Sequence, residues 1–89
     1  MAFSRDLALE LAPYRITVNV LAPGLVNTAQ PRQDPDVTEA QLAARGAAVP
    51  LGHMAEPDEM VPAVLFLCSA GGAYITGQTL HVNGGAWMA

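Results

Sequence analysis

The side chains of this sequence that could do chemistry are few and widely spaced. His53, His81 and the one cysteine, Cys68, lie far apart along the chain, so their spacing does not indicate a metal site. The sequence also has no serine–histidine–acid or cysteine–histidine motif of the kind that activates a nucleophile. A small hydrolase of unforeseen mechanism is therefore the weakest of the functional alternatives.

The acidic residues fall into two groups that helix formation explains better than catalysis does. Glu56, Asp58 and Glu59 surround Pro57, where a helix begins in the sequence pattern and where the helix dipole favours negative charge. Asp34, Asp36 and Glu39 lie in a proline-rich stretch. A pair of carboxylates acting as in a glycosidase is therefore not indicated. His81, on a predicted strand, is more typical of a packed or surface histidine than of a base.

The segment with the best prospect of contacting a ligand comes directly after a predicted strand. Residues 16–21 are mostly β-branched and apolar on both faces, which is typical of a strand covered on both sides in a parallel sheet. Pro23 and Gly24 end it. Ligands of open α/β sheets bind at the carboxyl ends of the strands, and Gly24 allows a tight turn close to a ligand. Taken alone, the segment is more often a plain turn, with Thr28 capping the stretch after it.

The other elements are placed by their periodicity. Apolar residues predict a helix over residues 3–11, ended by Pro13, and a helix over residues 57–69, ended by Gly71 and Gly72. Inside the second helix, Pro62 should cost about 3 kcal/mol or cause a kink. A strand over residues 78–82 and a turn over residues 83–85 complete the chain. Two strands joined through a helix predict a right-handed parallel crossover.

Residues 29–52, which we call the flap, carry a weaker signal. Pro31, Pro35 and Pro50 interrupt the segment, and one short helix is expected between Pro35 and Arg45, with Pro35 at its first position. The apolar face of that helix is built mainly from alanine. We therefore expect a mobile loop-and-helix flap.

Composition restricts the class of protein. The chain has 89 residues, enough for one small domain, and its 52% hydrophobic and 13% charged residues predict heavily buried elements. A net charge of −4 with four scattered arginines argues against a nucleic-acid partner. The longest apolar run, residues 60–68, is too short to cross a membrane, and no signal peptide is apparent. The single cysteine fits a cytoplasmic location.

Six local patterns resemble those of the short-chain dehydrogenase/reductase family, in the order and spacing of that family. They are Leu7–Ala12, Ile16–Asn19, Pro23–Thr28, Pro50–Pro57, Val64–Leu67 and Ile75–Gly85. Each is weak alone, but together they span nearly the whole chain. The resemblance is to the C-terminal portion of the family. It implies an α/β fold: a partial Rossmann-like unit, with two parallel strands and flanking helices, from a doubly wound sheet.

The resemblance also implies a function. Members of the family are NAD(P)-dependent oxidoreductases, which transfer hydride between a nicotinamide and a carbonyl or alcohol. Pro23, Gly24, Val26 and Thr28 match the family's cofactor-binding turn. By this resemblance the backbone at Val26 hydrogen-bonds the nicotinamide carboxamide, and the Thr28 hydroxyl assists. The residues that distinguish NAD from NADP, and those that select a substrate, are not part of the match.

The departures from the family pattern concern catalysis. The chain contains no lysine, so the family's Tyr-x-x-x-Lys pair is not in it: Val18 follows Tyr14 at that spacing, and Gln78 follows Tyr74. The phosphate-binding glycine loop is not in it either. Asn19 is better interpreted as a satisfied polar group than as a catalyst. We therefore assign no catalytic residue, and we expect the chain alone to be inactive in the family reaction and to retain a cofactor weakly.

Three single positions also depart from the family. Arg15 stands where the family often has a left-handed glycine, His53 where an arginine is frequent, and Ala55 where a glycine is frequent.

The apolar pattern predicts self-association. The strand over residues 16–21 has only one plausible neighbour in the chain, and the helix over residues 57–69 is too apolar for a single layer. We therefore expect a homo-oligomer, with a small-molecule ligand possible. The alternative to an oxidoreductase portion is a non-catalytic, self-associating truncated relative.

Overall fold

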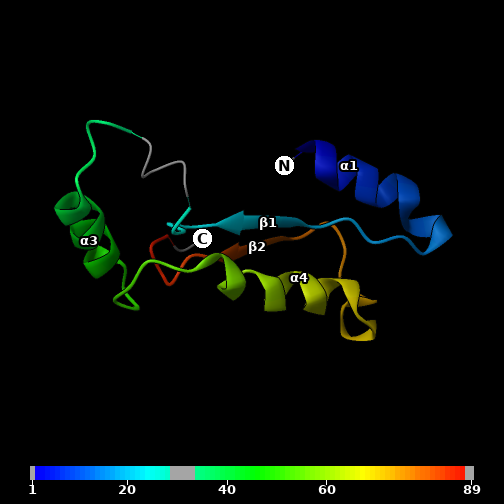
Figure 1. The fold of residues 1–89 in the computed structure, drawn as a ribbon. Helices are drawn as coiled ribbons and strands as arrows, with labels where there is room; N and C mark the ends of the chain where they lie inside the picture. The colour runs from blue at the N-terminus through cyan, green and yellow to red at the C-terminus, as the bar shows by residue number, and fades with distance from the viewer. Residues whose placement is uncertain (1, 29–33, 88–89) are drawn as a thin grey trace.

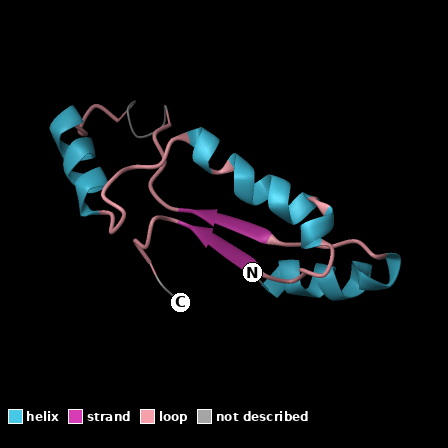
Figure 2. Cartoon of the chain, turned by 90° about the horizontal axis from the view of Figure 1, so that it is seen from below, coloured by secondary structure: helices cyan, strands magenta, loops and turns pink. Residues whose placement is uncertain are grey.

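A computed structural model of the chain describes residues 2–28 and 34–87. Its elements are α1 (Ala2–Leu11), η1 (Ala12–Tyr14), β1 (Val20–Pro23), α3 (Glu39–Ala48), η2 (Pro57–Glu59), α4 (Val61–Cys68), η3 (Ala70–Gly72) and β2 (Thr79–Val82). The two strands form a parallel pair at the centre, and α3 lies beyond their carboxyl ends (Figure 1). Helices α1 and α4 lie on opposite sides of the strands in both views (Figures 1 and 2). The predicted α/β class, with two parallel strands joined through a helix, is confirmed.

The strand pair is short and in register. Leu21 lies opposite Leu80, and Pro23, which has no N–H to donate, lies opposite Val82 at the end of the ladder. The ladder is closed at this end by the Gly24 N–H, which donates to the Val82 carbonyl at 3.1 Å. The prediction of a strand over residues 16–21 is wrong in its bounds, because β1 runs from Val20 to Pro23.

Just before β1 begins, hydrogen bonds from side chains replace the backbone hydrogen bonds of strand pairing. The Val18 N–H donates to the Thr76 hydroxyl at 3.0 Å, and the Asn19 amide donates to the Ile75 carbonyl at 3.0 Å. The Asn19 side-chain oxygen accepts the Gln78 N–H at 3.1 Å. Asn19 is thus a satisfied polar group, as predicted, and it delays the strand by using the bonds that regular pairing would need.

Helix α1 ends at Leu11, before Pro13, as predicted. The chain then makes the turn η1 and closes it with two bonds: the Arg15 N–H donates to the Ala12 carbonyl at 2.9 Å, and the Ile16 N–H donates to the Leu11 carbonyl at 3.4 Å. This is a Schellman motif, whose left-handed position is usually glycine. Here it is Arg15, with φ of 59°.

The helix of the flap begins later than predicted. The placement of Pro35 at its first position is wrong, because residues 34–37 form a turn in which the Val37 N–H donates to the Asp34 carbonyl at 3.1 Å. Helix α3 starts at Glu39, after a capping box between Thr38 and Gln41. The two reciprocal bonds of this box satisfy helix-start N–H groups, and Pro35 offers no such cap. The flap's residues 29–33 lie outside the described residues.

The helix predicted over residues 57–69 consists of two pieces. A single turn, η2, begins at Pro57, and α4 begins at Val61. Pro62 therefore lies in the first turn of α4, where a helix needs no N–H donor, so the expected interior cost does not arise.

The buried core of the described residues is small, and the expectation of heavily buried elements is wrong for this chain by itself. Its buried hydrophobic side chains are Ala8, Leu42 and Val49. Large apolar side chains that remain exposed are Phe3, Leu9, Tyr14, Ile16, Leu51, Val61, Val64, Leu65, Phe66, Tyr74, Leu80 and Trp87. The two short strands and three separate α-helices of the described residues cannot enclose side chains of this size.

The overall dimensions agree with this open packing. The radius of gyration is 16.0 Å, whereas a compact chain of this length has about 12 Å. The accessible surface is 6463 Å², and a compact monomer of this mass exposes about 5,000 Å². The molecule is elongated, with extents of 50 × 23 × 23 Å. The chain therefore exposes roughly 1,500 Å² more surface than a compact fold would, by the same size relation.

Gly24 fixes how closely the carboxyl ends of the two strands approach. A Cβ at this position would lie 2.7 Å from the Asn83 Cβ and 2.8 Å from the Asn83 Cα. The second atom is backbone, so the contact cannot be relieved by a side-chain rotation. The sequence predicts that Gly24 lets the backbone lie close to a ligand, and the structure adds that this glycine also permits close contact with Asn83.

The first prediction concerns Arg15. Replacing it with glycine should raise the free energy of unfolding by about 0.5–1 kcal/mol, because glycine adopts a positive φ without steric cost. Urea denaturation of the two proteins measures the difference. Arg15→Ala is the control, since alanine removes the side chain but keeps the strain. Equal stabilisation by alanine and glycine would show that strain is not the cause.

The second prediction concerns Gly24. Gly24→Ala should lower the free energy of unfolding by about 1–3 kcal/mol, because the added methyl group must push the Asn83 backbone away. Gly71→Ala is the matched control: its Cβ would meet the movable Phe66 ring, with the nearest atom at 3.1 Å. Denaturation curves should show a clearly larger loss for Gly24→Ala, and equal losses would contradict the assignment.

Candidate ligand cleft

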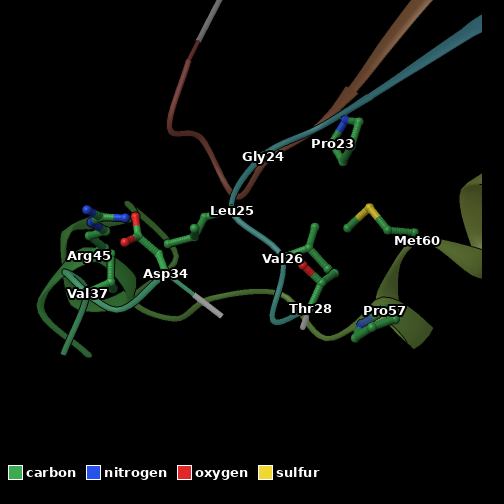
Figure 3. A pocket seen from close by; sticks show the side chains of 10 residues that line it. All are labelled: Pro23, Gly24, Leu25, Val26, Thr28, Asp34, Val37, Arg45, Pro57 and Met60. Carbon is green, nitrogen blue, oxygen red and sulfur yellow. The ribbon is translucent and has the colours of Figure 1, made fainter. Parts of the chain in front are cut away.

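An open cleft lies at the carboxyl end of β1 (Figure 3). It has a volume of about 710 Å³, and Pro23, Gly24, Val26 and Thr28, the four residues predicted for the cofactor-binding turn, all line it. The carboxyl edge of a parallel pair is where α/β proteins bind ligands. The structure thus brings together the four residues that the sequence singled out.

The turn that lines the cleft is held by a second short parallel pairing. Val26 forms an isolated bridge with Ala55, in which the Ala55 N–H donates to the Leu25 carbonyl at 3.0 Å and the Asn27 N–H donates to the Ala55 carbonyl at 2.7 Å. In this parallel pattern the bonds come from the residues on either side of Val26. The N–H and carbonyl of Val26 itself therefore point away from the Ala55 segment.

One of these two Val26 groups is still available. The Val26 carbonyl accepts the Thr28 N–H at 2.9 Å. The Val26 N–H has no hydrogen-bond partner within residues 2–28 and 34–87. Val26 lines the cleft, so a backbone donor that no described residue uses belongs to one of its lining residues, at the position that the resemblance predicts for binding the nicotinamide carboxamide.

The sequence analysis did not identify the residue that stabilises this turn through Asn27. The Asn27 side-chain amide donates to both oxygens of Glu56, at 3.1 and 3.3 Å. Glu56 also starts η2, where its N–H donates to the Glu59 carboxylate at 3.2 Å. The three acidic residues around Pro57 were visible as a helix start, but nothing local in the sequence indicated the contact of Glu56 with Asn27.

The cleft has an apolar end and a charged end (Figure 3). Pro57 and Met60 form the wall beside Val26 and Thr28. On the other side, Asp34 and Arg45 come from the flap, and their side chains point toward each other. A ligand in this cleft would therefore meet apolar side chains at one end and opposite charges at the other.

The remaining side chains with chemical potential lie elsewhere. His81 packs against the Trp87 ring, with centroids 4.5 Å apart, and Tyr74 is fully exposed. Cys68 is also exposed. Within the described part of the chain, no three metal-ligating side chains gather closely enough to hold an ion. Among the same residues, no helix combines the length and apolar character needed to cross a membrane.

The alternative interpretation of Thr28 as a cap finds no support in α3. That helix takes its cap from Thr38.

Comparisons with known proteins agree with the resemblance seen in the sequence. The family pattern described as Enoyl-(Acyl carrier protein) reductase matches residues 1–86. The chain is similar to 3-oxoacyl-[acyl-carrier-protein] reductases of Escherichia coli (47% identical over 88 residues), Vibrio harveyi (44% over 92) and Pseudomonas aeruginosa (44% over 86). These alignments cover 99%, 99% and 97% of the chain.

The same alignments cover only 35%, 35% and 34% of the relatives. The chain thus spans about a third of the length of the curated proteins it matches. With the family pattern matched over nearly every residue, the chain belongs to the short-chain dehydrogenase/reductase family, and it corresponds to that family's C-terminal portion.

Proposed function

We propose that the cleft binds the nicotinamide end of NAD or NADP, as the cofactor-contacting part of a Rossmann-like oxidoreductase that acts on a carbonyl or alcohol. The observation that carries this proposal is the unbonded Val26 N–H at the cleft lining. A backbone donor without a partner is costly once water is excluded from it, and an acceptor on a ligand removes that cost.

The residues around Val26 suit a nicotinamide ring. The carboxamide oxygen is an acceptor for the Val26 N–H, and the Thr28 hydroxyl can donate to or accept from the same group. Pro57 and Met60 provide apolar surface for the ring, and Met60 adapts readily to a flat partner. When bound, the nicotinamide supplies the hydride chemistry. The chain's own residues bind the ring and orient it.

The chain does not supply a proton donor for carbonyl reduction. Its sequence has no lysine, and Tyr14 and Tyr74 are exposed away from the cleft lining. The similar proteins are named as reductases of 3-oxoacyl-[acyl-carrier-protein]. A carbonyl on an acyl chain is therefore the substrate class we propose for a complete enzyme. The 89 residues alone are proposed to bind without turnover.

We propose further that the chain associates with itself, in the cytoplasm, through its exposed apolar side chains. The excess surface of roughly 1,500 Å² is about twice what one partner of a standard interface buries, which is about 800 Å². Leu80 in β2 and Trp87 after it are exposed, and Phe66 is exposed on α4. A second copy of the chain is one way to cover these groups.

The third prediction tests the cleft as a cofactor site. On titration with NADH or NADPH, amide NMR signals of residues 24–28 should shift, with a dissociation constant of roughly 1 mM because no phosphate loop is present. Thr28→Val should weaken binding several-fold by removing one hydrogen bond of about 1 kcal/mol. Val26→Ala should bind nearly normally, because it keeps the backbone N–H. Shifts confined to the surroundings of His81 would overturn the proposal.

The fourth prediction tests self-association. Sedimentation at several concentrations should show a symmetric dimer or tetramer, because covering apolar surface contributes about 25 cal/mol per Å². Replacing Trp87 with serine should shift the equilibrium toward the monomer. A compact monomer that unfolds cooperatively at every concentration would contradict it.

A further inference from the structure

His53 occupies a position between two separate parts of the cleft's support. Its Nδ1 lies 3.4 Å from the Leu51 carbonyl oxygen, and its Nε2 lies 3.3 Å from Glu59 Oε2. Leu51 belongs to the segment that returns from the flap, and Glu59 belongs to η2. Leu51 lies only two residues before His53, so its contact orients the ring within that segment, and the Glu59 contact joins the segment to η2.

Both partners of the ring are acceptors. A carbonyl oxygen and a carboxylate oxygen cannot donate, and a neutral imidazole carries a proton on only one of its nitrogens. The two contacts can be hydrogen bonds at the same time only when both nitrogens are protonated. Only the imidazolium can make both hydrogen bonds in this geometry, and loss of one proton must break one of the two bonds.

The charges that face His53 favour the same form. Glu59 is in contact with it, while Glu56 at the start of η2 and Glu39 from α3 line the same small hollow as the ring. The residues described around His53 in its two neighbouring hollows include no arginine. The hydrogen bond to Glu59, then the bond to Leu51 and the Glu59 charge, raise the pKa of His53 above its ordinary value of 6.5.

The segment that His53 anchors also holds the ligand-contacting turn. Two residues after His53, Ala55 forms both hydrogen bonds of the bridge to Val26. The next residue, Glu56, accepts a hydrogen bond from the Asn27 side-chain amide. The orientation of the Val26 N–H therefore depends on where this segment lies. Any change that loosens the segment also loosens the turn.

We propose that His53 is a pH-responsive latch: its imidazolium fastens the return segment of the flap to η2, and its deprotonation removes the charge that attracts Glu59, which weakens this attachment and loosens the Val26 turn. The latch stands on the geometry of His53, Leu51 and Glu59, and only its consequence for cofactor affinity rests on the proposed function.

His53 and Glu59 together set how the stability of the latch depends on pH. The pKa of His53 is raised, so the stabilisation is complete below about pH 6.5 and is lost as the pH rises through the folded pKa. The pKa of Glu59 is lowered, chiefly by the bond from the Glu56 N–H and then by His53, so its part is lost only as the pH falls through a value below 4.5. The latch is thus closed between about pH 4.5 and 6.5, and it opens as the pH rises through the raised pKa of His53.

The experiment measures hydrogen-exchange protection of the Ala55 amide in the full chain, with each rate divided by the intrinsic rate at the same pH. Between pH 6 and pH 8.5 the protection should fall by about twofold to fivefold, the range expected for an exposed ion pair. His53→Arg, whose cation does not titrate, should keep the protection constant. Glu59→Gln keeps an oxygen for the Glu56 N–H but removes the charge, so it should lower the pKa of His53.

Two results would overturn the latch. One is a fall in Ala55 protection in His53→Arg that equals the fall in the parent chain. The other is a His53 ring titration, followed by NMR, that Glu59→Gln leaves unchanged. Because no cofactor is present in these measurements, their failure leaves the nicotinamide proposal intact, and a failure of cofactor binding leaves the latch intact.

Discussion

The parallel bridge between Val26 and Ala55 is the constraint on which the cleft depends. It joins the turn after β1 to a segment about thirty residues further along the chain, through two bonds of 3.0 and 2.7 Å. Because the flanking residues make those bonds, the amide of Val26 is turned to the opposite side. The same bridge positions Glu56, which holds Asn27, and thereby joins the turn to the start of η2. The direction of the Val26 amide is a consequence of backbone pairing, and it does not require a particular side chain at position 26.

The short strands and the small core explain why the relative positions of distant segments depend on a few hydrogen bonds. With Ala8, Leu42 and Val49 as its buried hydrophobic side chains, the described part of the chain has little apolar burial to hold distant segments together. Polar contacts between segments far apart in sequence therefore matter more than usual: Asn19 with Ile75 and Gln78, and Asn27 with Glu56. The exposed apolar side chains are suited to burial against further protein. The composition is thus typical of a well-buried structure, whereas the chain by itself leaves many large apolar side chains exposed.

The sequence predicted the kinds and order of the elements, because periodicity and proline positions act locally. Helix α1 ends before Pro13, and Asn19 is satisfied as expected. The errors arose where a distant or competing contact decides the outcome. Asn19 and Thr76 delay β1, the Thr38–Gln41 capping box moves the start of α3 past Pro35, and Pro62 lies in a first turn because the helix is divided at Met60. Of the candidate site, the turn over residues 23–28 was predictable from its motif, whereas the partners Ala55 and Glu56 were not, since pairing across the chain leaves no local pattern.

The most direct test of the account is amide hydrogen exchange at Val26 and its neighbours in the free chain, at pH 6. The bridge predicts that the amides of Asn27 and Ala55, both hydrogen-bonded, exchange at least tenfold more slowly than that of Val26, relative to their intrinsic rates, if each bond is worth about 1.4 kcal/mol against local opening. Equal protection at all three positions, or protection of Val26 alone, would contradict the pairing and with it the assignment of the Val26 N–H to the cleft.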